Sequence, residues 1–470
     1  MHSLHSPSGG APATPKTGDA AASGAGPSPR QLLRADLPAV ASARPDSLGP
    51  RYYGLDALRV TTMVLVVVLH AALAYAVLPI PNLIWAVRDP AAHPAFDLLC
   101  WWTLSISSLF YLMSGFFAAE LCDARGVFAF LVNRSQRIGL PFLVACLFIL
   151  PATYLIWAVG WLISGQCTPR EFLRMKFHAT GYQQNIYGPA HLWSLEYLAI
   201  MLLAFAIFVW LRGSMARRLK PPASRLGWLD RSLASPWKPL LLAIPTTLIL
   251  WAGHRHVGLD AIMERINTFV PEPFRLAYNV VFFIVGVRLH RFRDNLESFA
   301  VHGWIYLALS VPVFACRAFL IHRDLVQSLD GPGALALAVT SALFAWLITF
   351  GLLGSGLALF KRPSSALRYF ADSSFWVYLT HFPIVGLVQV DLFAVPVHAA
   401  IKFLIAFMVT MALTLASYQV MVRHTFLGHW LHGRRDRARS ILPASPNIRL
   451  RLNLRSAAAQ RASAGQGPGS

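Results

Sequence analysis

Apolar runs of roughly 20 residues recur along this chain between residues 60 and 422. A run of that length matches the thickness of a bilayer core when it is helical, and a helix satisfies its own backbone polar groups in lipid. We therefore predict an all-α fold, a polytopic membrane bundle of about ten transmembrane helices. The runs are 60–78, 97–121, 139–160, 191–211, 239–253 (short, with Pro245), 274–290, 303–321, 334–360, 374–393 and 399–422.

Composition favours a membrane protein over a soluble one. The 470 residues are 56% hydrophobic and 13% charged, with a mean hydropathy of +0.52. A soluble domain cannot bury that share of apolar side chains. The five cysteines show no paired spacing, so neither a disulfide framework nor a metal site is predicted. They are Cys100, Cys122, Cys146, Cys167 and Cys316.

Lys and Arg are unevenly distributed between alternate loops. With a cytoplasmic N-terminus, one set of loops (122–138, 212–238, 288–302, 361–372) holds 16 of them, and the other (79–95, 161–190, 254–273, 322–333, 394–398) holds seven. This positive-inside bias predicts that both termini are cytoplasmic. The net charge of +20 then indicates contact with anionic lipid headgroups. Nucleic acid binding is not expected, because this sequence contains no soluble domain in which a basic patch is interleaved with aromatic side chains.

The two ends of the chain differ in composition from the apolar part. Residues 1–51 are rich in Ala, Gly, Pro and Ser, and residues 426–470 are rich in Arg. Such segments are typically disordered. We predict a disordered cytoplasmic tail over 1–51, a transmembrane domain over 52–425 and a basic, disordered cytoplasmic tail over 426–470. No apolar stretch precedes residue 60, so the first helix is expected to act as an uncleaved insertion signal.

Arg59 directly precedes the first apolar run, and His70 lies inside this run. Ionisable residues in a lipid-embedded helix are costly and commonly functional. At a rise of about 1.5 Å per residue, His70 lies about 16 Å beyond Arg59, which predicts Arg59 at the cytoplasmic interface and His70 near the middle of the membrane. Desolvation keeps a buried imidazole neutral, and a general base must be neutral. Helix packing is the alternative role for His70.

Arg134 and Arg137 occur in NRSQRIGLPFLV, at the start of the third apolar run. Three residues apart on a helix, their guanidinium groups share one face and can bind phosphate oxygens together. The alternative is that they only follow the positive-inside rule.

Other polar residues fall inside or at the ends of later runs. His381, in SSFWVYLTHFPIV, lies at a depth comparable to that of His70. Glu196 follows Trp193 in GPAHLWSLEYL, one to two turns inside the fourth run, where a carboxyl group needs a partner or a proton. Arg317 lies toward the outer end of the seventh run, where it can meet an anion or extend to the interface.

Two further segments carry structural signals. Ser114-Gly115, in YLMSGFFAAEL, predicts close packing against another helix backbone, and His191 suits an interface position. The loop 161–190 holds residues that bind sugar hydroxyls but are equally common in polar loops: Tyr182, Gln183, Gln184, Asn185 and Tyr187.

This combination of motifs resembles the membrane acyltransferase-3 family. The resemblance lies in an arginine, ten residues and a histidine on the first helix, followed by Arg-x-x-Arg at the start of the third. The segments GLDALRVTTMVLVVVLHA, FYLMSGFFAAEL, HLWSLEYL and FWVYLTHFPIV are similar to the branch called glucans biosynthesis protein C, which succinylates periplasmic glucan. The resemblance covers residues 52–425.

The resemblance implies a multi-pass acyltransferase of the bacterial inner membrane that carries an acyl group, succinyl in this branch, from cytoplasmic acyl-CoA to hydroxyls of a periplasmic glucan. Its partners would be acyl-CoA, the glucan and membrane lipids, with no tightly bound cofactor and no metal. The expected site comprises catalytic His70, Glu196 and His381, the acyl-CoA ligands Arg59, Arg134 and Arg137, and the substrate contacts Trp193 and Arg317.

Two questions stay open at the level of sequence. Transfer can proceed by direct attack of an alkoxide on the thioester or through an acyl-histidine intermediate. A secondary transporter or exporter of a glycan or lipid would also use a helical bundle with buried ionisable groups. The absence of a detected internal repeat and the arginine pair favour the acyltransferase over the transporter. A sensor or scaffold without catalysis is a third alternative.

Overall fold

The computed structural model describes residues 52–78, 80, 83–178, 188–216, 227–258, 267–425 and 428. All the regular secondary structure in these ranges is helical, as predicted. The predicted tails 1–51 and 426–470, apart from Gly428, lie outside the described residues. The sugar-binding candidates between Tyr182 and Tyr187 also lie outside them.

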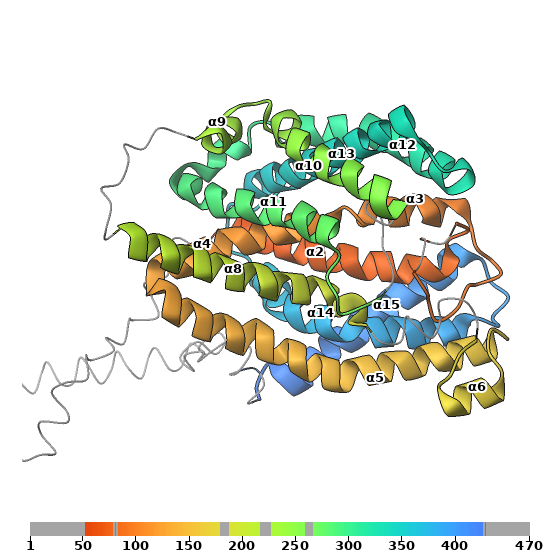
Figure 1. Cartoon of the computed structure of the whole chain (residues 1–470). Coiled ribbons are helices and arrows are strands. Elements are labelled where there is room, and N and C mark those ends of the chain that lie inside the picture. The colour runs from red at the N-terminus through yellow and green to blue at the C-terminus, as the bar shows by residue number, and fades with distance from the viewer. Residues whose placement is uncertain are drawn as a thin grey trace, which may run out of the picture. The chain divides into compact units, whose positions relative to one another are not determined.

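The long helices run side by side (Figure 1). They are α2 (Tyr53–Ala72), α3 (Pro94–Thr103), α4 (Ile106–Arg134), α5 (Leu140–Ile163), α8 (Trp193–Ala216), α10 (Lys238–Val257), α11 (Pro273–Leu289), α12 (Gly303–Gln327), α13 (Gly331–Leu359), α14 (Ser365–Leu392) and α15 (Ala399–Ser417). Shorter helices are α6 (Pro169–Arg174), α9 (Trp228–Ala234), η2 (Leu73–Tyr75), η3 (Ser135–Gly139), η4 (Ala190–Leu192), η6 (His290–Phe299) and η7 (Tyr418–Val422). Helix α2 packs against both α13 and α14, which lie on opposite sides of it.

Seven described stretches are long and apolar enough to cross a membrane. They are Tyr53–Tyr75, Pro94–Ile163, Ala190–Gly213, Leu296–Gln327, Gly331–Leu359, Ser365–Leu392 and Ala399–Val422. The second contains both α4 and α5, and α10 and α11 occupy the fifth and sixth predicted runs. The helical membrane bundle is therefore confirmed. The number of crossings and the side of each terminus stay predictions.

Two predictions are wrong for the second predicted run and for the loop after it. The run 97–121 is divided at Leu104 and Ser105 into α3 and α4, and the predicted loop 122–138 is helical almost throughout. Helix α4 continues through a kink at Gly126, whose φ of 78° suits a residue without a side chain. The chain then passes through the π-helix η3 directly into α5. The polar composition of residues 122–138 therefore did not correspond to a loop.

Helices α4 and α11 approach each other at two glycines. A Cβ atom on Gly115 would lie 2.0 Å from the Phe283 carbonyl oxygen, and one on Gly286 would lie 1.9 Å from the Leu112 carbonyl oxygen. Real Cβ atoms do not come that close to backbone, so only glycine fits at either place. The close packing predicted for Ser114-Gly115 is confirmed.

The loop after α5 begins with a capped turn of helix. Thr168 and Glu171 form a capping box at the start of α6. Backbone and side-chain hydrogen bonds from Thr168 and His178 to the carboxylate lower the pKa of Glu171 to about 2. Glu171 therefore stays ionised as a cap over the whole physiological pH range.

We expect Gly115→Ala to destabilise the bundle by about 1–3 kcal/mol, because the added methyl group must push two backbones apart. Thermal unfolding of the purified protein in detergent measures this. Gly213→Ala is the matched control, since a Cβ there meets no other atom within 4 Å and alanine favours a helix. Equal melting temperatures for the two variants would contradict the packing argument.

Candidate active site

Two histidines that are 311 residues apart in the chain meet between α2 and α14. Nδ1 of His70 lies 2.9 Å from Nε2 of His381. His70 belongs to the last turn of α2 and is partly accessible, whereas His381 is fully buried. The sequence predicted a similar depth for both residues but not their contact. On α2 itself, His70 lies close to the helix end rather than at its middle.

Backbone carbonyls determine which ring nitrogens carry hydrogen. Nδ1 of His381 lies 2.8 Å from the Tyr378 carbonyl oxygen and 3.1 Å from that of Val377. A carbonyl only accepts, so this Nδ1 donates, and Nε2 of neutral His381 must accept a hydrogen bond from Nδ1 of His70. Neutral His70 is then left with a lone pair on Nε2. This is the atom that can take a proton from a substrate.

A third histidine, His191 in η4, completes the cluster. Its ring stacks on Phe382 at 4.4 Å and lies edge-on to His381 at 5.3 Å. Nε2 of His191 donates to the Leu379 carbonyl oxygen at 3.1 Å. Its Nδ1 is therefore an acceptor, and among the described residues this buried nitrogen has no hydrogen-bond partner. The sequence placed His191 only at an interface, because no spacing links it to His70.

Aromatic and amide side chains hold His70 in place. The Trp85 ring stacks on His70 with 5.8 Å between centroids, and Phe382 meets it edge-on at 4.8 Å. Trp85 donates to Gln389 at 2.6 Å, and Gln389 donates to the backbone carbonyls of His70 and Ala71 at 3.2 and 2.9 Å. Sequence reasoning missed Trp85 and Gln389. Trp85 lies in a predicted outer loop that instead packs into the bundle.

The start of α8 is fixed against α14. The Tyr378 hydroxyl donates to the His191 carbonyl oxygen at 2.6 Å and lies 2.7 Å from the Ser194 hydroxyl. Trp193, predicted to contact substrate, lies 4.4 Å beneath the guanidinium group of Arg275. Glu196 follows one turn later, close enough to α5 for its charge to act on Cys146. The structure thus groups Trp193 and Glu196 on the helix that His191 precedes.

The three predicted acyl-CoA ligands gather where α2 begins and α4 ends. The charges of Arg137 and Arg59 both act on Arg134, as does that of Glu120. Arg134 donates to the Phe117 carbonyl oxygen at 3.2 Å, and its buried Nε has no partner among the described residues. Because Arg137 lies in the π-helix η3, the pair does not have the regular α-helical spacing that was predicted. Such π segments are frequent at functional sites.

Arg317 is buried rather than extended to an interface. It is 2% exposed and donates to Ser341 at 3.2 Å and to the Trp101 carbonyl oxygen at 2.7 Å. It therefore joins α12 to α13 and α3.

We expect ¹⁵N NMR of histidine-labelled protein in detergent to find His70 and His381 both protonated on Nδ1. The reason is the order of donors and acceptors from the Tyr378 carbonyl oxygen to His70. Loss of one signal set in His70→Ala assigns the resonances. A neutral His70 protonated on Nε2 would contradict the hydrogen-bond order.

Residues 52–419 match the family model of the acyltransferase-3 domain, described as an acyltransferase domain. No curated protein and no solved structure matches the chain.

Proposed function

The chain belongs to this acyltransferase family and is a membrane acyltransferase, and on that premise we propose that it moves an acyl group from cytoplasmic acyl-CoA to hydroxyls of a periplasmic glucan. We further propose a succinyl donor and the bacterial inner membrane as its location. The main support is the hydrogen bond between His70 and His381, because it leaves a proton acceptor on Nε2 of a histidine inside the bundle.

In the proposed reaction, Nε2 of His70 accepts the proton of the glucan hydroxyl while the hydroxyl oxygen attacks the thioester carbonyl carbon. The carbon–sulfur bond then breaks, and the departing thiolate of coenzyme A takes the proton from His70. An imidazolium donates from both nitrogens, so the bond from Nδ1 of His70 to His381 is kept throughout. His381 thereby orients the base and stabilises its charged form.

The residues around His70 have complementary roles in this proposal. The Trp85 and Phe382 rings keep water away from His70, which limits hydrolysis of the thioester. The unpaired Nδ1 of His191 can accept a hydrogen bond from the glucan. Trp193 and Glu196, at the start of α8, would line the route of the acceptor to His70.

The arginine cluster would bind the donor. Coenzyme A carries several phosphates, and guanidinium groups bind phosphate oxygens through charge-assisted hydrogen bonds. Arg134 offers an unused buried Nε, and Arg59 and Arg137 add positive charge nearby. From Arg59 to His70 is about 16 Å along α2, a distance that the pantetheine arm would cover.

We expect His70→Ala to lower the transfer of radiolabel from succinyl-CoA to glucan by a factor of about 10²–10⁴, the usual contribution of a general base. Purified protein in detergent serves for the assay, and His424→Ala, which changes an exposed histidine, is the control. Undiminished transfer by His70→Ala would remove the catalytic role. Movement of unlabelled glucan across vesicles without transfer would favour a transporter.

We expect Arg137→Ala to weaken coenzyme A binding, with an increase in the dissociation constant of roughly tenfold for one lost charge-assisted contact. Isothermal titration with coenzyme A measures this without the acceptor. Arg368→Ala is the matched control, since Arg368 is an exposed arginine in the first turn of α14. Unchanged affinity in Arg137→Ala would contradict the phosphate role.

A further inference from the structure

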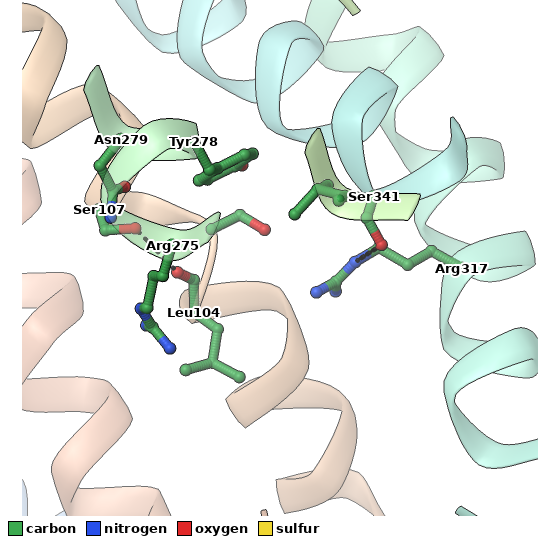
Figure 2. A pocket seen from close by; sticks show the side chains of 9 residues that line it. Leu104, Ser107, Arg275, Tyr278, Asn279, Arg317 and Ser341 are labelled. Atoms are coloured by element: carbon green, nitrogen blue, oxygen red, sulfur yellow. Dashed lines mark hydrogen bonds between the residues drawn. The ribbon is translucent and has the colours of Figure 1, made fainter. Parts of the chain in front are cut away.

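A small polar cavity of about 20 Å³ lies among α4, α10, α11, α12 and α13. Arg317 enters it from α12, and Arg275, Tyr278 and Asn279 enter it from α11 (Figure 2). Ser341 adds a hydroxyl group to the lining. A cavity of this size has room for a water molecule or a small polar group, but not for a sugar ring or a nucleotide.

The cavity has positive charge on its wall and no acidic residue among those that line it. Arg317 is 2% exposed, and its bonds to Ser341 and to the Trp101 carbonyl oxygen are to neutral acceptors. A guanidinium group stays charged in proteins, and a buried charge is normally matched by an opposite one. The charge of Arg317, which meets neutral acceptors in both of these bonds, therefore favours an anion in the cavity.

Asn279 provides an independent indication of a ligand. It is 1% exposed, and neither its amide nitrogen nor its amide oxygen has a hydrogen-bond partner among the described residues. Buried amides in native proteins are almost always hydrogen-bonded. Because this amide lines the same cavity as Arg317, the missing partner belongs in the cavity.

The cavity lies near the start of α8, the helix that follows His191. The guanidinium group of Arg275 lies 4.4 Å over the Trp193 ring, and Trp193 directly follows the short helix η4 that carries His191. On the side of α4, the Tyr111 hydroxyl donates to the Ser194 carbonyl oxygen at 3.1 Å. A ligand in the cavity would thus be close to the start of α8.

We propose that this cavity is a carboxylate-binding site, in which Arg317 supplies the positive charge and the Asn279 amide donates a hydrogen bond. A guanidinium group binds the two oxygens of a carboxylate through parallel hydrogen bonds. A planar carboxylate is smaller than a tetrahedral phosphate, which suits a cavity of about 20 Å³. The carboxylate is either that of a small free acid or the free end of a dicarboxylic acyl group. Only the second source rests on the proposed function.

The first experiment measures binding without activity. Melting temperatures of the whole protein in detergent and chloride-free buffer are compared with and without sodium succinate, acetate or sulfate. We expect both carboxylates to raise the melting temperature of the native protein. Asn279→Leu should lose this response. Asn279→Asp should lose it too but melt higher without ligand, because it supplies the carboxylate itself.

Ser310→Ala is the matched control, since among the described residues its hydroxyl bonds only to the Leu307 carbonyl oxygen one turn away on α12. This variant should keep the full response. Sulfate stabilisation as large as that by succinate would overturn the choice of carboxylate. A full response in Asn279→Leu, or none in the native protein, would overturn the site. Two Asn279 variants with opposite expected stabilities keep the test valid if one folds poorly.

The second experiment identifies the source of the carboxylate by comparing succinyl-CoA with butyryl-CoA, which has the same number of acyl carbons and no carboxylate. If the acyl end occupies the cavity, Asn279→Leu lowers kcat/KM for succinyl-CoA by about tenfold, the value of a hydrogen bond to a charged group, and leaves butyryl-CoA unchanged. If a free acid occupies it, both donors respond alike. Absence of any transfer would refute the proposed function, while the melting experiment would still decide the site.

Discussion

The candidate site depends on the hydrogen bond between His70 and His381. This bond forms because the interior of the helix bundle offers few hydrogen-bond partners to an imidazole. In an apolar bundle each buried polar atom must find a partner within the protein. The Tyr378 and Val377 carbonyl oxygens, which already belong to α14, accept from His381 and thereby fix its acceptor nitrogen toward α2. The orientation of the proton acceptor on His70 thus follows from the backbone of a different helix.

The same need for partners brings residues 83–93 into the bundle. Lys402 of α15 and Asp89 form an ion pair of 2.6 Å with both side chains 2% exposed, and Trp161 donates to the Trp85 carbonyl oxygen at 3.0 Å. Removing either charge would leave the other unpaired in the interior. These contacts hold the Trp85 ring against His70, so an ion pair away from the histidines contributes to the geometry of the site.

The sequence predicted the structure correctly where a single residue type or a hydrophobic run determines the local conformation or packing. Apolar runs predicted the helices, and Gly115 predicted close packing. The positions of His70 and His381 in their runs predicted a similar depth for the two residues, which is consistent with their contact. Sequence reasoning failed where pairing depends on tertiary structure. Trp85 and Gln389 carry no local signal, because their partners lie about 300 residues away in the chain. The helical segment 122–138 was also missed, since its polar and charged residues are what a loop would contain.

The two groups of arginines differ in a way that bears on what each can bind. Arg59 has a side chain 43% exposed and lies 3.7 Å from Asp56, so water can screen its charge and a ligand can leave readily. Arg317 is enclosed and faces neutral oxygens, so its charge is strongly felt by whatever enters the cavity. A partly exposed cluster suits a large, dissociable anion such as a nucleotide phosphate, and an enclosed arginine suits a small group that must be discriminated by charge. On the proposed function, the arginine cluster around Arg134 would determine how strongly the donor binds, and the cavity at Arg317 would determine which acyl group is accepted.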